Sequence, residues 1–204
     1  TAPPYSGCSE LLPAPCASPL ELDGEDIGGP ILAALPVVED YKVQLAAKPE
    51  LQSVEQGSYI EAESGQVVLG MEVGKDAEAS GGQFVWAPGK PGEKGGGEGS
   101  VTWRLQLPEA APYFVWARLK TPTPEDDSFF VRAFTPTAEP VGQTDWHTGV
   151  HEAWEWTPLS LAQGGQITPL NLPQGEVSLQ LRAREDGAAV DQLFITPYED
   201  QKPQ

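Results

Sequence analysis

Two acidic residues near the start of the strand-rich part of the chain are spaced so that they could hold a cation. Glu61 and Glu63 are separated by one residue, and alternate residues of a strand project from the same face. Carboxylates that converge repel one another unless a hard cation lies between them, and Ca²⁺ accepts about six to eight oxygen ligands. The spacing is therefore typical of a calcium site. An acidic, solvent-exposed face on an edge strand is the alternative.

A group of aromatic and polar residues between positions 145 and 156 has side chains of the kinds that bind sugars. Sugar recognition uses aromatic rings that lie flat against the pyranose face and polar side chains that bond its hydroxyls. Trp146 lies in the loop-like stretch 142–149, so we expect its ring to be exposed. Trp154 and Trp156 share one face of a strand, which is either a binding surface or part of the core. The candidate ligand-binding residues are Trp146, Trp154, Trp156, Asp145, His147 and Glu155.

Motifs for catalysis are weak in this sequence. His147 and His151 have the spacing of a helical zinc pair, but Gly149 lies between them and the required glutamate does not follow the first histidine. No Gly-x-Ser-x-Gly nucleophile elbow occurs. Any two of the 30 acidic residues could still form a glycosidase pair in the fold. We expect a non-catalytic protein.

The charge of the chain disfavours two kinds of partner, nucleic acids and anionic membrane surfaces. Its 204 residues include 30 acidic and 12 basic ones, which gives a net charge of −18. This charge repels nucleic-acid phosphates and anionic membrane surfaces. No apolar run approaches the roughly 20 residues of a membrane-spanning helix. We therefore expect no nucleic-acid partner and no membrane span, and we interpret most of the acidic residues as keeping a secreted, extracellular protein soluble.

From residue 58 onward the sequence predicts many short strands. Apolar and polar residues alternate over 101–107 and again over 177–182, which is the period of a half-buried antiparallel strand. Further strand-like segments are bounded by Pro, Gly or Asp. They comprise residues 59–63, 84–86, 113–119, 128–134, 154–161, 167–172 and 190–196. About eight or nine strands favour an all-β fold, a two-sheet antiparallel β-sandwich of the jelly-roll type.

The first 56 residues differ from the rest in being rich in proline. Residues 1–56 are predicted to form an irregular N-terminal arm, 57–199 the sandwich and 200–204 a C-terminal tail. Residues 41–45 alternate like a strand and could extend a sheet edge, either that of the same chain or that of a neighbour. Cys8 and Cys16 have a spacing that can close a small loop, so we expect a disulfide in an oxidising compartment, with two reduced cysteines as the alternative.

Three segments of the sequence, in order along the chain, resemble a known family. Residues 59–65 (Tyr-Ile-Glu-Ala-Glu-Ser-Gly) look like the opening strand of calcium-containing carbohydrate-binding jelly rolls, residues 79–86 are similar to the next block, and residues 184–196 resemble the closing strand. Over residues 58–197 the chain thus resembles the carbohydrate-binding modules of families 6 and 35 and the C-terminal domain of family 115 glucuronidases. The resemblance implies that the closing strand lies near the opening one, so that Asp191 joins Glu61 and Glu63 around a structural Ca²⁺.

Two functions are compatible with these features. The first is that of a non-catalytic extracellular carbohydrate-binding module that docks polysaccharide or another glycan. The alternative is a structural subunit of an extracellular polymer or filament, a homo-oligomer that self-assembles through residues 1–56. Removal of the arm distinguishes them, because a sugar binder would keep its affinity whereas an assembly subunit would become monomeric.

Overall fold

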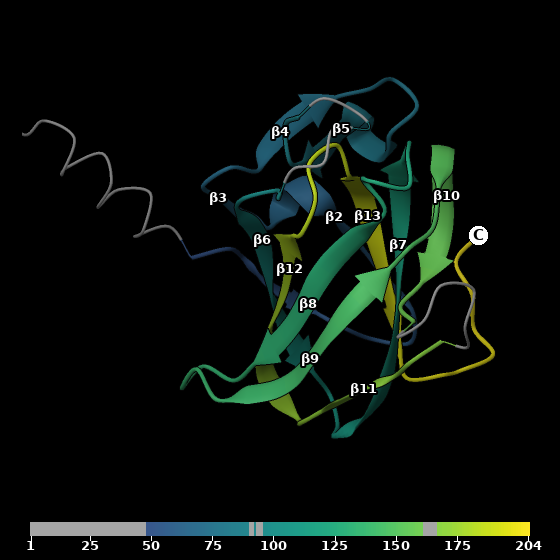
Figure 1. The fold of residues 1–204 in the computed structure, drawn as a ribbon. Coiled ribbons are helices and arrows are strands. Elements are labelled where there is room, and N and C mark those ends of the chain that lie inside the picture. Colours follow the sequence, from purple (N-terminus) through teal and green to yellow (C-terminus); the bar gives the residue numbers. More distant parts are fainter. Residues whose placement is uncertain (1–47, 90–91, 93–95, 161–166) are drawn as a thin grey trace, which may run out of the picture. The chain divides into compact units, whose positions relative to one another are not determined.

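Alternating apolar residues build two β-sheets that pack face to face in this computed structural model (Figure 1). The structure describes residues 48–89, 92, 96–160 and 167–204, which lie in one unit of the chain, Leu45–Gln204. These residues form thirteen strands and two 3-10 turns, Ala62–Ser64 (η1) and Ser80–Gly82 (η2). No helix among them has the length and apolar character needed to span a membrane. The predicted all-β sandwich is confirmed.

One sheet has six strands. It comprises β1 (Leu51–Ser53), β3 (Gln66–Val68), β6 (Ser100–Leu107), β8 (Ser128–Phe134), β9 (Pro140–His147) and β12 (Gly175–Ala183). β12 lies between β6 and β8, and β9 follows β8 at the edge, all in antiparallel pairs. β3 also pairs antiparallel with β6, whereas β1 runs parallel to it. The sheet therefore departs from the predicted antiparallel pattern at β1.

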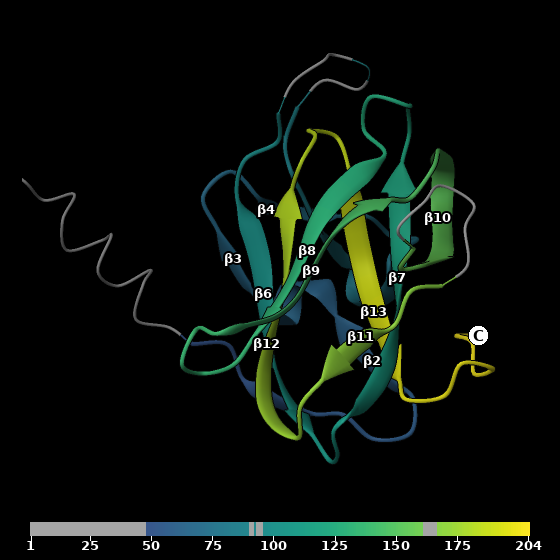
Figure 2. The same ribbon diagram turned by 60° about the horizontal axis from the view of Figure 1, so that its bottom comes forward.

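The other sheet has seven strands. It comprises β2 (Ser58–Glu61), β4 (Glu72–Lys75), β5 (Gln83–Trp86), β7 (Ala111–Thr121), β10 (His151–Pro158), β11 (Leu170–Leu172) and β13 (Ala189–Thr196). β13 pairs with β7 on one side, and β10 pairs with β7 on the side away from β13 (Figure 2). β2 pairs antiparallel with β13, so the opening and closing strands are neighbours, as the resemblance implied.

The core lies between the two sheets and is built from alternate residues of the long strands. Trp103, Leu105, Leu179 and Leu193 have no exposed surface. Each such side chain contributes about 1.5–3 kcal/mol through burial. A slip of one residue in register would move these side chains to solvent, so the core also fixes which residues face outward. The predicted alternation over 101–107 and 177–182 is confirmed by this burial.

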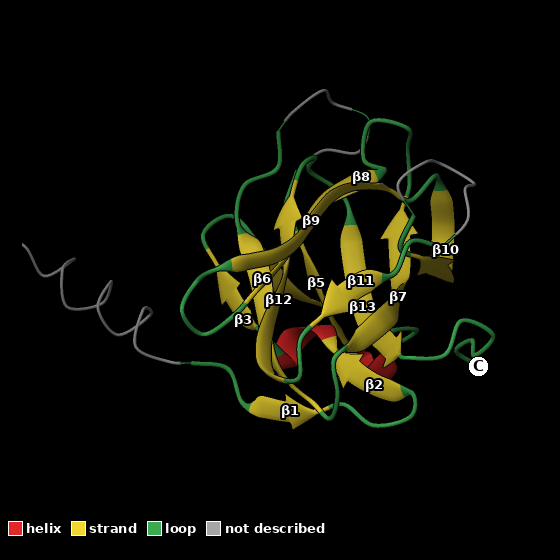
Figure 3. Cartoon of the chain, turned by 90° about the horizontal axis from the view of Figure 1, so that it is seen from below, coloured by secondary structure: helices red, strands yellow, loops and turns green. Residues whose placement is uncertain are grey.

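The sandwich begins before the predicted boundary at residue 57. Strand β1, at the bottom of the view in Figure 3, pairs with β6 on the side away from β12, and Val54, which follows β1, is 2% exposed. A guanidinium nitrogen of Arg104 donates to the carbonyl oxygen of Pro49 at 3.2 Å. Residues 1–47, with Cys8, Cys16 and the segment 41–45, lie outside the described residues. The disulfide and self-assembly through the arm therefore stay predictions.

The C-terminal residues are bonded to the sandwich. Gln201 accepts a hydrogen bond from the Thr196 hydroxyl and donates one to the carbonyl oxygen of Gln56 at 3.4 Å. The backbone nitrogen of Gln204 donates to the hydroxyl of Tyr59 at 2.9 Å. Residues 200–204, predicted as a separate tail, are thus attached to the end of the sandwich from which β2 starts.

Candidate functional site

Trp146 is buried in the core, and its predicted role in an exposed loop is wrong. It lies in β9, opposite Phe129 of β8, and has no exposed surface. Its indole nitrogen donates to the carbonyl oxygen of Pro158 at 3.1 Å, so the polar atom of the ring is also satisfied. The polar residues before it suggested a loop, but Thr144 and Trp146 face inward in a strand. The ring cannot contact a ligand.

The other predicted ligand residues are divided between the two sheets. Asp145 and His147 flank Trp146 in β9 and face outward from the six-stranded sheet, with Asp145 exposed and His147 half-buried. Glu155 lies in β10 of the other sheet, where its carboxylate is 3.3 Å from Nδ1 of His151. The predicted residues therefore do not form one site.

Trp154 and Trp156 lie in β10 with half-buried rings held by neighbours. The indole nitrogen of Trp154 donates to Oδ2 of Asp76 at 3.0 Å, and its ring centroid is 5.3 Å from that of Phe84. The ring centroid of Trp156 lies 5.8 Å from that of Tyr59, in an edge-to-face arrangement. These contacts place both rings on the outer face of the seven-stranded sheet, because Trp156 is in register with Arg118, which alternates with buried residues of β7.

The three acids predicted to bind Ca²⁺ are neighbours. Asp191 lies near Glu61 because β13 pairs with β2, as the resemblance implied, but the predicted strand spacing of Glu61 and Glu63 is wrong. Glu61 ends β2 and Glu63 lies in the η1 turn, so the pair does not share one face of a continuous strand. Ser80 connects Glu61 with Asp191. Its hydroxyl donates to Oε1 of Glu61 at 2.8 Å and its backbone nitrogen to Oδ1 of Asp191 at 2.9 Å. The side chain of Gln192 also donates to Oε1 of Glu61, at 2.7 Å.

Two of these acids have carboxylate oxygens without a hydrogen-bond partner, and the third is paired with an arginine. Oε2 of Glu61 and Oε2 of Glu63 are buried without a hydrogen-bond partner. Asp191 is fully buried, and its Oδ2 is paired with the guanidinium of Arg118. Burial raises the pKa of Glu63, and the nearby charges of Glu61 and Asp191 raise it further. Burial likewise raises the pKa of Asp191.

A cation fits the chemistry of this acidic cluster, defined as Glu61, Glu63 and Asp191. Three carboxylates and one guanidinium leave two negative charges where two buried oxygens have no partner. Buried charge without a partner is costly, and a divalent cation removes that cost. Among the described residues, however, no group of three or more Asp, Glu, His or Cys side chains is already arranged around a metal position. Glu61 and Glu63 therefore offer the free ligand atoms, whereas Asp191 is already neutralised by Arg118.

A groove crosses the outer face of the six-stranded sheet and has a volume of about 410 Å³. We call it the sheet groove. Its floor is formed by outward-facing residues of β3, β6 and β12, and the end of β8 with the following turn forms a wall. Its lining includes Gln66, Val68, Thr102, Arg104, Phe134, Pro136, Glu176, Ser178 and Gln180.

Polar side chains in the sheet groove are held in place by one another. Nε of Arg104 donates to Oε1 of Glu176 at 2.9 Å, and these side chains are 22% and 28% exposed. The amide nitrogen of Gln180 donates to the hydroxyls of Thr102 at 3.0 Å and Ser100 at 3.3 Å. Hydrogen bonding from Arg104 lowers the pKa of Glu176 below its ordinary value. The groove therefore presents planar polar groups that hold one another in fixed positions.

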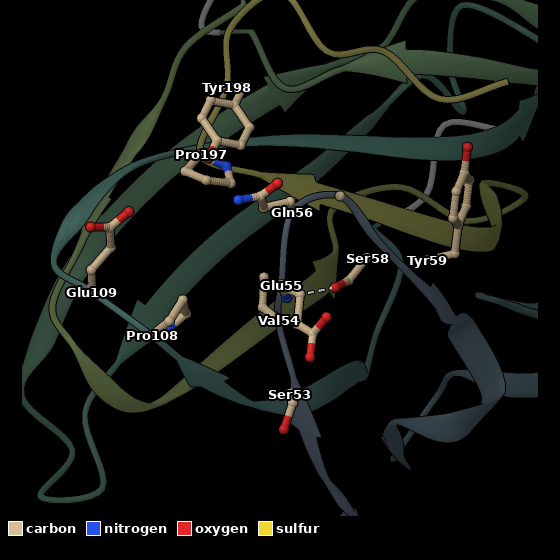
Figure 4. A pocket seen from close by; sticks show the side chains of 11 residues that line it. Ser53, Val54, Glu55, Gln56, Ser58, Tyr59, Pro108, Glu109, Pro197 and Tyr198 are labelled. Carbon is tan, nitrogen blue, oxygen red and sulfur yellow. Dashed lines mark hydrogen bonds between the residues drawn. The ribbon is translucent and has the colours of Figure 1, made fainter.

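A second hollow lies at the end of the sandwich and has a volume of about 810 Å³ (Figure 4). We call it the end hollow. It is bounded by the segment between β1 and β2, the turn between β6 and β7, and the chain after β13. Its lining consists of Ser53, Val54, Glu55, Gln56, Gly57, Ser58, Tyr59, Pro108, Glu109, Pro197 and Tyr198.

Comparisons with solved structures define the class of fold. A family 35 carbohydrate-binding module from Clostridium thermocellum matches 71% of this chain and 100% of its own, with 17% identity and a TM-score of 0.52. Isomalto-dextranase from Arthrobacter globiformis T6, complexed with panose, matches 70% of this chain with 15% identity and a TM-score of 0.53. The C-terminal family 6 module of LamC, a marine laminarinase from Zobellia galactanivorans, matches 69% with 16% identity and a TM-score of 0.48.

The sandwich has the fold of the family 35 carbohydrate-binding module, as the three sequence segments indicated. The match spans the whole of that module but only 24% of the isomalto-dextranase chain. A scan against models of protein families found no match. A search of curated proteins found none either.

Neither hollow was predicted from the sequence. The outward positions of Arg104 and Gln180 follow from strand alternation, but the pairing of β6 with β12, which brings these residues together, does not. Tyr59 was placed in the opening strand without a role, and Tyr198 lies beyond the last predicted strand. Their common hollow depends on how the segment before β2 and the chain after β13 come together, which no local pattern encodes.

Proposed function

We propose that this chain is a non-catalytic carbohydrate-binding module that docks a polysaccharide in the sheet groove. The observation that carries the proposal is the ordered set of planar polar groups formed by Arg104, Glu176 and Gln180 on an open sheet face. Guanidinium, carboxylate and amide groups present donors and acceptors in a plane, and this arrangement matches the neighbouring hydroxyls of a sugar ring.

The sheet groove also has apolar surface for the C–H face of a sugar. Phe134, Pro136 and Val68 contribute to its lining beside the polar groups. The volume of about 410 Å³ lies within the range of roughly 300–1,000 Å³ for small-ligand sites. Because Arg104 and Gln180 are already held by partners, little side-chain freedom is lost on binding. The groove is thus suited to a hydroxyl-rich chain that lies along the sheet.

We also propose that Ca²⁺ stabilises the opening of the sandwich. Glu61 and Glu63 would supply the free carboxylate oxygens, and Asp191 the neighbouring charge. The ion would be structural, because it would join η1 to β13, whereas the sheet groove lies on the other sheet. An extracellular location stays a prediction, in keeping with a module that holds an enzyme or a cell near its substrate.

The proposal is tested by binding of the full chain to a glycan array and to insoluble polysaccharides. We expect retention of the wild-type chain on at least one polysaccharide and a loss of roughly tenfold or more in affinity for Arg104→Ala, because this change removes the guanidinium and frees Glu176. Lys75→Ala, which removes an exposed cation from β4, is the matched control and should bind like wild type. Equal retention of the wild-type and Arg104→Ala chains would refute the sheet groove as the site.

A further inference from the structure

The end hollow has the features of a second ligand site that is separate from the sheet groove. We infer that it binds an amino-sugar unit through its protonated amine and its ring face. The inference goes beyond the proposed function, because the end hollow shares no lining residue with the sheet groove. Its support comes from the exposed rings, the fixed rim and the charge of the lining.

Two exposed aromatic rings line the end hollow. Tyr59 is 47% exposed and Tyr198 is 44% exposed. A few large apolar side chains are markedly exposed in the part of the chain that the structure describes. Tyr59 and Tyr198 are the aromatic ones among them. Figure 4 shows the two rings standing on either side of Gln56. Exposed aromatic rings beside a hollow are the usual means by which proteins contact the faces of sugar rings.

The ring of Tyr59 is held in position by two neighbouring aromatic rings and by one hydrogen bond. Its centroid is 4.8 Å from that of Phe194 and 5.8 Å from that of Trp156. Its hydroxyl accepts a hydrogen bond from the backbone nitrogen of Gln204 at 2.9 Å. The Tyr59 ring therefore needs no further ordering when a ligand contacts its exposed face, and this reduces the entropy lost on binding.

The opposite rim is fixed by the chain after β13. The backbone nitrogen of Tyr198 donates to the Thr196 hydroxyl at 3.1 Å, and its carbonyl oxygen accepts from the backbone nitrogen of Gln201 at 3.3 Å. Gly57 has a φ of +85°, and a Cβ there would approach Nε2 of Gln201 to 2.5 Å. Glycine at this position thus lets the two sides of the rim meet.

The charge of the lining selects the ligand class. Glu55 and Glu109 are exposed at the end hollow, and its lining, all of it described, contains no Lys, Arg or His. Two carboxylates in a lining that contains no basic residue attract an ammonium group and repel a uronate or a sulfate. Tyrosine faces also attract an ammonium that lies within about 6 Å of the ring centroid. A sugar that carries a protonated amine satisfies both kinds of contact.

The test measures binding of a glucosamine hexamer to the full chain by isothermal titration calorimetry at about physiological salt, where distant charges are screened. We expect the affinity to fall about tenfold in Tyr198→Ala and severalfold in Glu109→Gln. Glu152→Gln, which removes an exposed carboxylate from β10, is the matched control and should leave the affinity unchanged. The neutral N-acetylglucosamine hexamer should bind more weakly than the glucosamine hexamer.

Three results would overturn the inference. The first is that the glucosamine hexamer does not bind, and the second is that Tyr198→Ala leaves the affinity unchanged. The third is an equal loss of affinity in Glu109→Gln and Glu152→Gln, which would indicate attraction to net charge alone. The Arg104→Ala variant separates this inference from the proposed function. If glucosamine binding depends on Arg104 and not on Tyr198, the ligand lies in the sheet groove and the end hollow is not a site.

Discussion

Side chains in the sheet groove are held by partners that also adjust their chemistry. Arg104 contacts both Glu176 and the carbonyl oxygen of Pro49, so its guanidinium is fixed from two directions. This pairing lowers the pKa of Glu176. A glutamate with a lowered pKa is fully charged above the ordinary pKa of about 4.3, and the stability that depends on this charge is then fully present. Both the charge and that stability are lost as the pH falls through the lowered pKa.

Binding in the sheet groove should therefore tolerate mild acid. We expect the affinity for the bound polysaccharide to stay constant from pH 7 down to about 4.3 and to fall below that value as Glu176 takes up a proton. Surface plasmon resonance with immobilised protein measures the profile, and Glu176→Gln should bind more weakly with a flat profile over the same range. An affinity that declines well above pH 4.3 in wild type would show that Glu176 is not the group that titrates.

Trp146 contributes to stability and not to recognition. Because its ring has no exposed surface and its indole nitrogen bonds Pro158, Trp146→Ala leaves both a cavity and an unpaired carbonyl. We expect a loss of about 3–5 kcal/mol in the free energy of unfolding, measured by denaturant titration. The affinity of the folded protein for glycans should not change. The same substitution lowering affinity without lowering stability would mean that the ring contacts ligand after all.

At the scale of elements, the acidic cluster joins β2, the turn η1 and β13, which contribute Glu61, Glu63 and Asp191 respectively. A ligand that binds only the folded state at a hundredfold excess over its Kd stabilises by about 2.7 kcal/mol. For a domain of this size that corresponds to a rise in Tm of about 5–10 °C. We expect this rise on adding Ca²⁺ to chelator-treated protein, and its absence in the double variant Glu61→Gln, Glu63→Gln.

Calorimetric scans with Mg²⁺ and with Glu72→Gln provide the controls for the calcium prediction. Glu72 is exposed in β4, so its variant should respond to Ca²⁺ as wild type does. Mg²⁺ requires a smaller, more regular site and should raise the Tm less. A Tm that is the same with Ca²⁺ and with chelator would show that Ca²⁺ does not stabilise the acidic cluster. Arg118 would then be its cation.

The short strand β1 determines where the N-terminal arm can be cut. A chain that begins at residue 48 keeps β1 and Val54, whereas a chain that begins at residue 57 loses both. We expect the first to unfold at the same denaturant concentration as the full chain, and the second to be less stable by about 1–3 kcal/mol, chiefly from the loss of buried Val54. If the shorter chain is as stable as the longer one, β1 is not part of the folded sandwich.

At the scale of the whole molecule, local sequence patterns predicted the layers but not the sites. Alternation over 101–107 and 177–182 located two long strands, and the Glu61 segment pointed to the opening of a jelly roll. In β9 the polar residues and Gly142 are typical of a loop, so the sequence predicted an exposed loop where Trp146 lies buried in a strand. Recognising the sheet groove required knowing that Arg104 lies beside Ser178 of β12, a pairing set by the global fold.

The most direct test of the account is to locate a bound polysaccharide fragment on the full chain by NMR. Amide shifts of ¹⁵N-labelled protein should change, on titration with a fragment of the polysaccharide that retains the chain, at Thr102, Arg104, Glu176 and Gln180, and these changes should be lost in Arg104→Ala. Changes confined to the outer face of the seven-stranded sheet, around Trp154 and Trp156, would contradict the proposed site and return the function to the aromatic residues that the sequence first suggested.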